Sequence, residues 1–219
     1  FLKDPFKHQM DAVAACNNTD LDKFAYLMEM GTGKTLTALV DLVLLNQRDM
    51  VDYAVVLAPK SVYRNWMKEI NTFLSGEFDY KVNTWDPSLV DPYTKEYLGT
   101  DTFFLKALKH KLHIFLMNIE ALSTPKGTKY LTHLLGRRIP DKMMMIVDES
   151  TTIKTHTAKR TKTLLKMSEK IGYKRILTGT PITKSPLDIF SQFSFLDKNR
   201  LGKNYYAFRA RYAKIISRP

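Results

Sequence analysis

The chain alternates between short apolar runs and longer amphipathic segments, and this alternation constrains its fold more than any other feature. The apolar runs have the length of strands and lie at 24–28, 53–58, 80–85, 113–117, 143–147 and 174–177. Between them, the patterns of apolar residues predict helices at 34–45, 62–74, 103–109, 128–135, 159–171 and 187–196. Strands that alternate with helices predict βαβ units, and runs without polar alternation predict a sheet covered on both faces. We therefore expect an α/β fold with a mostly parallel central sheet and helices on both faces.

The length fits a single domain. A chain of 219 residues suits one α/β domain, so we treat 1–219 as one unit and expect the aromatic, basic stretch 198–219 to form a helical extension. Residues 86–102 contain two prolines and a glycine, which predicts an irregular surface segment. No apolar run approaches the roughly 20 residues of a membrane helix, and no signal-peptide pattern is present. We expect no membrane partner.

Cysteine, histidine and charge content narrow the possible functions. The one cysteine, Cys16, excludes an intrachain disulfide and a zinc site built on cysteine pairs, and we expect it to be a small half-buried residue. The five histidines form no metal-ligand pattern, and we expect His113 to be solvated. A net charge of +12 favours a polyanionic partner, of which nucleic acid is the first choice, although a solvated lysine-rich surface would carry the same charge.

A glycine-rich turn between the run 24–28 and the helix at 34–45 predicts a phosphate loop. The turn consists of Met30, Gly31, Thr32, Gly33, Lys34 and Thr35. Its glycines let successive backbone amides converge on an anion, and the following helix adds the positive end of its dipole. Lys34 would bridge the β- and γ-phosphates of ATP, and the Thr35 hydroxyl would reach Mg²⁺. The similar letters KGTK at 126–129 follow no predicted strand, so we assign 126–129 to a loop.

Two carboxylates, Asp148 and Glu149, directly follow the apolar run 143–147. Alone, such a pair would also fit a solvated helix N-cap. Ligands of parallel sheets bind at the carboxyl ends of the strands, so the pair is expected to face the phosphate loop. Asp148 would then hold Mg²⁺ through a water, and Glu149 would orient and deprotonate the attacking water. We assign the methionines of the run 143–147 to core packing.

The order of several short blocks resembles one protein family. Upstream of the phosphate loop, the amide of Gln9 offers the donor and acceptor that match N6 and N7 of adenine. The blocks at 57–66, 148–154 and 177–181 read LAPKSVYRNW, DESTTIK and LTGTP. With the phosphate loop, they make the chain similar to the first RecA-like domain of superfamily 2 helicases, and most closely to the Swi/Snf-type double-stranded DNA translocases. The resemblance spans nearly the whole chain, and the blocks at 57–66 and 177–181 are its most specific part.

The resemblance implies a RecA-like P-loop NTPase fold and three further roles. Gln9 is implied to read adenine. The position at which the family's second motif meets a DNA backbone holds Pro59, Lys60 and Ser61. The position at which the family couples the γ-phosphate to domain movement holds Thr178, Gly179 and Thr180. In this fold the strand before Thr178 is implied to lie between the phosphate-loop strand and the Asp148 strand.

Three features of the sequence depart from the family pattern. Ser150 and Thr151 follow the acid pair where alanine and histidine are common, and Thr183 and Lys184 replace the usual polar pair after the last block. Met28 stands where the Swi/Snf group often has an acid. These departures indicate a divergent member from a bacterium or a phage, so we expect the protein inside the cell, in the cytoplasm of a bacterium or a phage-infected host.

The resemblance also implies two partners. Family members hold ATP between two RecA-like domains, and the second domain supplies arginines to the γ-phosphate. No second phosphate-loop half is present in the sequence, so a second RecA-like domain is missing from this chain, and we expect the chain alone to bind nucleotide but hydrolyse it slowly. The other partner is DNA, which the protein is expected to contact through the phosphate backbone. Residues 118–124 are further candidates for these contacts. The aromatics Tyr205, Tyr206, Phe208 and Tyr212 we assign to a packed helix face.

Four functions stay open at this point. The first is the ATP-binding motor domain of a translocase on double-stranded DNA. The second is a strand-separating helicase or the motor subunit of a restriction complex, which shares these motifs. The third is a P-loop kinase unrelated to nucleic acid, against which the blocks at 57–66 and 177–181 argue. The fourth is a degenerate binding module, against which the intact phosphate loop and acid pair argue.

Overall fold

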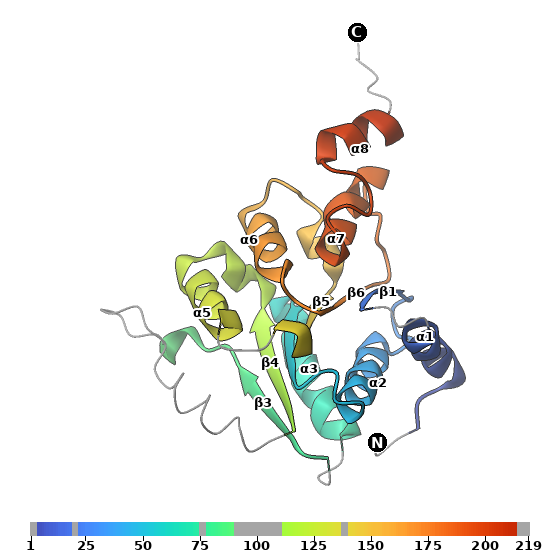
Figure 1. Cartoon of the computed structure of the whole chain (residues 1–219), viewed down its shortest axis with the longest axis vertical. Coiled ribbons are helices and arrows are strands. Elements are labelled where there is room, and N and C mark those ends of the chain that lie inside the picture. The colour runs from blue at the N-terminus through green and yellow to red at the C-terminus, as the bar shows by residue number, and fades with distance from the viewer. Residues whose placement is uncertain (1–3, 19–21, 75–77, 90–110, 137–139, 214–219) are drawn as a thin grey trace.

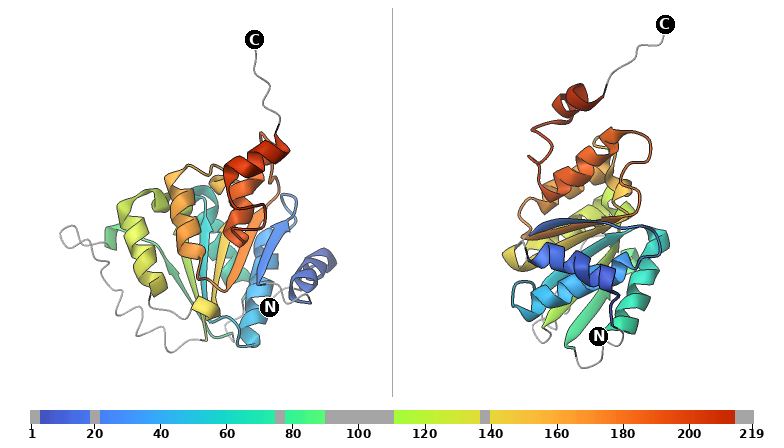
Figure 2. Two further views of the ribbon diagram at one scale, coloured as in Figure 1. Left: turned by 45° about the horizontal axis from the view of Figure 1, so that its top comes forward. Right: turned by 90° about the vertical axis from the view of Figure 1, so that its right-hand side faces the viewer.

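The computed structural model describes residues 4–18, 22–74, 78–89, 111–136 and 140–213. They form a three-layer α/β domain in which a six-stranded sheet lies between two layers of helices (Figures 1 and 2). This confirms the expected fold class. Among the described residues, no helix combines the length and apolar character that crossing a bilayer demands.

The sheet is parallel throughout its described strands. The strands are β1 (Lys23–Leu27), β2 (Tyr53–Ala58), β3 (Tyr80–Thr84), β4 (Leu112–Asn118), β5 (Met143–Asp148) and β6 (Tyr173–Thr178). Each predicted strand is confirmed to within one residue at either end. Their spatial order is β1-β6-β5-β2-β4-β3, and every neighbouring pair is parallel. The strand before Thr178 therefore lies between the phosphate-loop strand and the Asp148 strand, as expected.

Helices cover both faces of the sheet. One layer contains α1 (Lys7–Asn17), α2 (Lys34–Gln47) and α3 (Lys60–Phe73), and the other contains α5 (Pro125–Gly136), α6 (Lys159–Ser168) and α7 (Ile189–Leu196). The right-hand view of Figure 2 shows the first layer below the sheet and α7 above it. A further helix, α8 (Tyr205–Tyr212), lies beyond α7 toward the C-terminus (Figure 1).

The core consists of two clusters, one on each face. Met143 and Met145 of β5 pack in the α5–α7 cluster, while Met144 packs in the cluster of α2 and α3. Their burial confirms that these methionines are core residues. On the α2 face, Arg175 of β6 donates to Asp41 of α2 at 2.7 Å, and both side chains are almost fully buried. This ion pair joins the helix that begins at the phosphate loop to the strand that leads to Thr178.

Helix α1 was absent from the expected elements, and two burial predictions were wrong. Only Gln9, Val13 and Cys16 of α1 are buried, so the helix lacks a wide apolar stripe. Cys16 is fully buried rather than half-buried, because it lies in the cluster formed with α2. His113 is 3% exposed rather than solvated, because it is the second residue of β4 and its ring stacks on Tyr53.

Segment 126–129 is helical, which corrects its assignment to a loop. It belongs to the first turn of α5, where Pro125 is the first residue and the Thr124 hydroxyl accepts a hydrogen bond from the Gly127 amide at 3.1 Å. Proline at the first position and a threonine hydroxyl before it are both favourable at a helix start. The expected helix at 103–109 and residues 90–102 of the expected irregular segment lie outside the described residues.

The remaining helices begin or end a few residues away from the predicted bounds. Helix α3 begins at Lys60, directly after β2, rather than at residue 62, and α6 ends at Ser168. Within the expected extension 198–219, residues Tyr205–Tyr212 form α8, and residues 214–219 lie outside the described residues. The aromatic face of α8 is only partly packed, since Phe208 is buried while Tyr206 is 71% and Tyr212 54% exposed.

Candidate functional site

The turn after β1 has the backbone of an anion-binding loop. Gly31 and Gly33 have φ of 82° and 80°, in the left-handed region that glycine adopts without strain. A β-carbon on Gly33 would also lie 2.2 Å from Nε2 of Gln9. Helix α2 begins at the next residue, Lys34, and buries Thr35 in its first turn. The loop therefore leads directly into a helix N-terminus, as phosphate binding requires.

Lys34 reaches across the loop that precedes it. Its Nζ donates to the carbonyl oxygen of Glu29 at 3.3 Å, and the hydroxyl of Thr32 donates to the same oxygen at 2.8 Å. The positive charge of Lys34 also acts to lower the pKa of Asp148. The fold thus places the phosphate-loop lysine close enough to the first acid of the pair for their charges to interact, although 114 positions separate them in the chain.

Asp148 is the last residue of β5 and is 3% exposed. Its Oδ2 accepts a hydrogen bond from Nε1 of Trp66 at 2.7 Å, and its Oδ1 accepts one from the backbone amide of Glu149 at 2.9 Å. Burial raises the pKa of Asp148 above its ordinary value, while the bonds from Trp66 and Glu149 and the charge of Lys34 counteract the rise. A buried carboxylate held by two donors is a fixed, oxygen-based ligand for a hard cation.

The contact from Trp66 was missed in the sequence. The block at 57–66 contributed to the resemblance, but nothing in it pointed to Asp148. Trp66 is fully buried in α3, and α3 directly follows β2, the neighbour of β5 in the sheet. The sequence did not show that β5 and β2 are neighbours in the sheet. This pairing brings Trp66 and Asp148, which are 82 positions apart in the chain, within hydrogen-bond distance.

Glu149 adopts a conformation that is rare for a residue with a β-carbon. Its φ of 46° and ψ of 62° place it in the left-handed region. The short helix η4 (Ser150–Ile153) follows at once, and the amide of Thr152 donates to the carbonyl of Glu149 at 2.9 Å. Such strain costs roughly 1–3 kcal/mol and is found where the surrounding structure requires a particular side-chain direction.

Segment 178–180 lies beside the phosphate loop. Leu27 of β1 pairs with Thr178, and the Met28 amide donates to the Thr178 carbonyl at 3.2 Å. A β-carbon on Gly179 would lie 3.2 Å from the Met28 carbonyl oxygen and 3.3 Å from the Met30 amide nitrogen. Any larger residue at Gly179 would press on the entrance of the loop.

Gln9 links α1 to the phosphate loop. Its Nε2 donates to the Thr32 carbonyl at 2.9 Å, and its Oε1 accepts from the Phe6 amide at 2.9 Å. Gln9 and the loop line one end of a cavity of about 490 Å³, and α3 supplies residues such as Asn65 and Glu69 at the other end. An amide has two donor hydrogens and two acceptor positions. Within the described part of the chain, the hydrogen bonds to Phe6 and Thr32 use one of each.

The expected DNA-contacting residues lie at the carboxyl ends of the strands. Lys60 and Ser61 are exposed in the first turn of α3, and Pro59 beside them is half-buried. Ala58 pairs with Asn118, so the candidate segment 118–124 begins at the same edge. Because β2 also pairs with β5, these residues lie at the same edge of the sheet as the acid pair.

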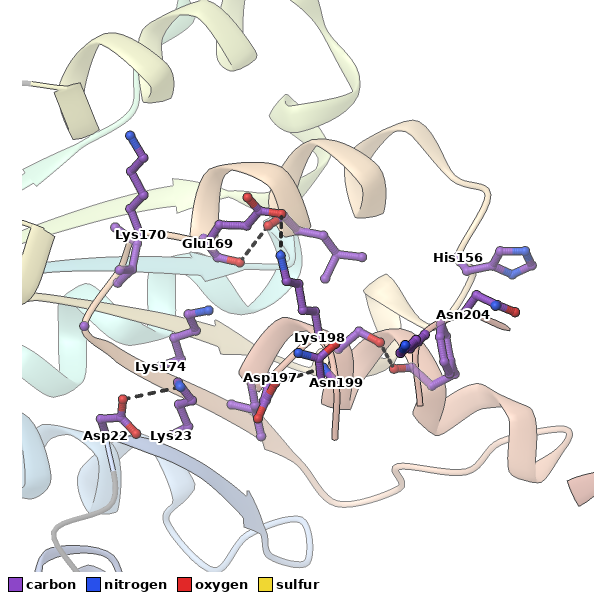
Figure 3. Close-up of a pocket in the computed structure, with 18 of the residues that line it drawn as sticks. Asp22, Lys23, His156, Glu169, Lys170, Lys174, Asp197, Lys198, Asn199 and Asn204 are labelled. Carbon is purple, nitrogen blue, oxygen red and sulfur yellow. Dashed lines mark hydrogen bonds and ion pairs between the residues drawn. The ribbon is translucent and has the colours of Figure 1, made fainter. Parts of the chain in front are cut away.

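A larger cavity of about 920 Å³ lies at the opposite end of the sheet, near the first residues of β1 and β6 (Figure 3). Figure 3 shows Lys23 reaching Asp22 and Lys198 reaching Glu169, at 3.5 and 3.9 Å. Five lysines and four carboxylates line this cavity, so their charges nearly cancel. It also contains none of the expected site residues. The smaller cavity is the one that contains Gln9 and the glycines of the phosphate loop.

The SNF2-related domain family matches residues 26–217 of the chain. Protein CHROMATIN REMODELING 24 of Arabidopsis thaliana is 30% identical over 202 residues, which cover 87% of this chain and 16% of that protein. The SWI/SNF-related matrix-associated actin-dependent regulator of chromatin subfamily A-like protein 1 homolog of Caenorhabditis elegans is 27% identical over 188 residues, which cover 84% of this chain and 23% of that protein. The chain thus spans less than a quarter of the length of these two relatives.

Two solved structures share the fold. The Sulfolobus solfataricus SWI2/SNF2 ATPase core, solved in complex with double-stranded DNA, matches with a TM-score of 0.69 at 21% identity and covers 97% of this chain and 41% of that one. A nuclease-deletion mutant of the Type ISP restriction-modification enzyme LlaGI matches with a TM-score of 0.59 at 15% identity, over 83% of this chain and 18% of that one. The RecA-like fold seen here is thus the fold of these cores. On the family match, the chain belongs to the SNF2-related domain family.

Proposed function

We propose that the chain binds ATP with Mg²⁺ and serves as the first motor domain of an ATPase that translocates on double-stranded DNA. The strand order β1-β6-β5 carries this proposal. It sets the phosphate loop, segment 178–180 and the acid pair side by side at the carboxyl ends of three neighbouring strands. Adjacent strands lie roughly 4.8 Å apart, so the three groups fit within the length of one triphosphate.

The proposed roles in nucleotide binding follow from the geometry. The amides from Met30 to Thr35 would cradle the phosphates, and Lys34 would exchange its long bond to the Glu29 carbonyl for the β- and γ-phosphates. In the cavity beside the loop, Gln9 would use its remaining donor and acceptor to read adenine. Family membership supports the use of ATP.

The proposed metal is Mg²⁺. The Thr35 hydroxyl and the Asp148 carboxylate would hold it, and both are oxygen ligands in the first turn of α2 and at the end of β5. Within the described part of the chain, no group of three or more histidines, cysteines or carboxylates is arranged to bind a metal. Few protein ligands suit Mg²⁺, which keeps waters and phosphate oxygens in its coordination shell. When bound, it would neutralise charge on the phosphates.

Glu149 is proposed to orient and deprotonate the attacking water. It directly follows Asp148, and its left-handed backbone turns the chain away from the strand direction at this point. Thr178, Gly179 and Thr180 would couple the state of the γ-phosphate to domain movement. The Thr178 carbonyl accepts a hydrogen bond from the Met28 amide, and Gly179 lies against Met28 and Met30 at the start of the phosphate loop.

DNA and a second RecA-like domain are the proposed partners. Lys60 and Ser61 offer an exposed ammonium and a hydroxyl to a phosphate backbone at the edge beside the ATP site, and the net charge of +12 favours a polyanion. The second domain would supply an arginine, worth on the order of 10³ to 10⁵ in rate. We treat residues 1–219 as one domain, with α8 leading toward that second domain. Alone, this domain should bind ATP and hydrolyse it slowly.

The test is ATP hydrolysis by the full-length protein, with and without duplex DNA, beside Glu149→Gln. We expect turnover that DNA stimulates and that falls steeply as salt is added, since backbone contacts release counterions. The Glu149→Gln variant should still bind ATP. Displacement of a third strand from intact duplex would support translocation, whereas release of a duplex strand would favour the helicase alternative. Turnover that ignores DNA would refute the proposal.

A further inference from the structure

A buried glutamine on α7 connects the acid pair to segment 178–181. The side chain of Gln192 is fully buried. The Ser150 hydroxyl donates to its Oε1 at 2.6 Å, and its Nε2 donates to the carbonyls of Pro181 and Asp188 at 2.7 and 2.8 Å. Carbonyl oxygens only accept hydrogen bonds, so these contacts determine which end of the amide is nitrogen. Both amide hydrogens of Gln192 donate to carbonyl oxygens, so only one orientation of the amide makes all three hydrogen bonds.

A second set of contacts joins the same two segments. Lys154, four residues after Ser150, donates to the Thr183 hydroxyl and lies 3.9 Å from Oδ2 of Asp188. The same oxygen accepts from the Thr183 hydroxyl at 2.8 Å and from the Lys184 amide at 2.8 Å. Burial acts to raise the pKa of Asp188, but these hydrogen bonds and the charge of Lys154 hold it at about 2. Asp188 therefore stays ionised near neutral pH, and the contacts persist.

These contacts use two of the positions that depart from the family pattern. Ser150 introduces a hydroxyl directly after the acid pair, and Gln192 supplies the acceptor that a buried hydroxyl requires. Thr183 introduces a second hydroxyl, which Asp188 accepts. The hydroxyls at these two positions find their partners in Gln192 and Asp188, and the contacts connect the two segments.

The connection begins one residue from the strained Glu149. A left-handed residue with a β-carbon persists only where its surroundings hold it. Ser150 is fully buried, and its bond to Gln192 holds the backbone that leaves Glu149. Release of that bond would let residues 149 and 150 relax toward a more favourable backbone and would redirect the Glu149 carboxylate.

We propose that Gln192 is a positioning residue for Glu149, acting through Ser150. It also ties this backbone to Pro181, so the acid pair and segment 178–181 move together. The inference rests on the proposed function, in which Glu149 orients the attacking water. Gln192 is not among the residues that line the cavity beside the phosphate loop. Its loss should therefore slow the chemical step and leave nucleotide affinity unchanged.

The experiment is single-turnover ATP hydrolysis by the full-length protein with DNA, run beside a nucleotide-binding titration. The variants are Gln192→Met, Ser150→Ala and their combination, with Glu149→Gln as reference. We expect Gln192→Met and Ser150→Ala each to slow hydrolysis roughly 10- to 100-fold, the range expected from a small misplacement of a catalytic group, with the dissociation constant for ATP unchanged. The double variant should be no slower than the slower single variant, because one hydrogen bond carries both effects.

Ser194→Ala is the matched control. Ser194 lies on the same helix, and its hydroxyl donates to the Phe190 carbonyl at 2.7 Å, outside the connection. The Ser194→Ala variant should hydrolyse ATP at the wild-type rate. Thermal unfolding of each variant separates a rate effect from a loss of fold, and Ser150→Ala, which removes one oxygen atom, keeps the test valid if Gln192→Met unfolds.

The outcomes separate the inference from the proposed function. If Glu149→Gln slows hydrolysis while Ser150→Ala keeps the wild-type rate, Gln192 does not position Glu149 and only the inference falls. The inference also falls if Gln192→Met weakens ATP binding in step with its loss of thermal stability, which would mean a purely structural role. If Glu149→Gln itself hydrolyses ATP at the wild-type rate, the proposed function of the acid pair fails, and the inference fails with it.

Discussion

Replacing Trp66 with phenylalanine tests how the carboxylate of Asp148 is held. The indole Nε1 donates to Oδ2 of Asp148 at 2.7 Å, and the two residues are 0% and 3% exposed. A hydrogen bond to a charged group contributes about 1.5–3 kcal/mol. The smaller ring leaves unfilled volume, which adds about 1–2 kcal/mol. We therefore expect Trp66→Phe to lower the free energy of unfolding by about 2.5–5 kcal/mol, as measured by urea denaturation.

The same substitution should weaken Mg²⁺ binding. The bond from Trp66 acts to lower the pKa of Asp148, so its loss should raise that pKa further and leave less carboxylate at a given pH. The assay is the Mg²⁺ dependence of ATP affinity at mildly acidic pH. Trp85→Phe is the matched control, because Trp85 is buried at the end of β3 on the other face of the sheet. It should lower stability and leave the Mg²⁺ dependence unchanged. The reasoning is refuted if Trp66→Phe also leaves that dependence unchanged.

Three further predictions follow from single contacts. Lys34→Ala should abolish ATP binding in a titration, because the loop then lacks the positive charge that binds the phosphates. ATP binding by the variant with the wild-type dissociation constant would contradict a phosphate-binding role for Lys34. Arg175→Met should lower the free energy of unfolding by about 3–5 kcal/mol, because Asp41 would be left as a buried charge without a counter-charge. An exposed ion pair contributes at most about 1 kcal/mol. A loss below that value would show that the pair is not buried in solution. Burial raises the pKa of Asp148 above its ordinary 3.8, so Mg²⁺ affinity should rise as the pH increases through that raised pKa. Without metal, the free energy of unfolding should fall over the same pH range, because the folded protein binds the proton more tightly than the unfolded chain does. Titrations across this range in wild type and Asp148→Asn would show the dependence only in wild type.

The strands and the two halves of the site were predictable because their signals are local. The runs at β2 and β5 are apolar over their full length, as expected for strands buried on both faces. The phosphate loop and the acid pair each directly follow such a strand, so the rule that ligands bind at strand ends placed both at one edge. Segment 178–180 was placed by the family resemblance, and the strand order confirms it.

The remaining features depend on packing between distant segments. Helix α1 buries only three residues, one of them Gln9, so its apolar pattern is too sparse to read. The bond from Trp66 to Asp148 requires β2 and β5 to be neighbours. The contact of Ser150 with Gln192 requires α7 to return over the end of β5. None of these pairings has a local signal in the sequence, and each contributes to the geometry of the site.

The Mg²⁺ dependence of ATP affinity in the chain, compared between wild type and Asp148→Asn, tests the central claim most directly. If the phosphate loop and the end of β5 form one nucleotide site, Mg²⁺ will tighten ATP binding to the wild type and will have little effect on the variant. Both proteins should still bind ATP without metal, because Lys34 and the loop amides are intact. Equal tightening by Mg²⁺ in the two proteins would show that Asp148 lies outside the site.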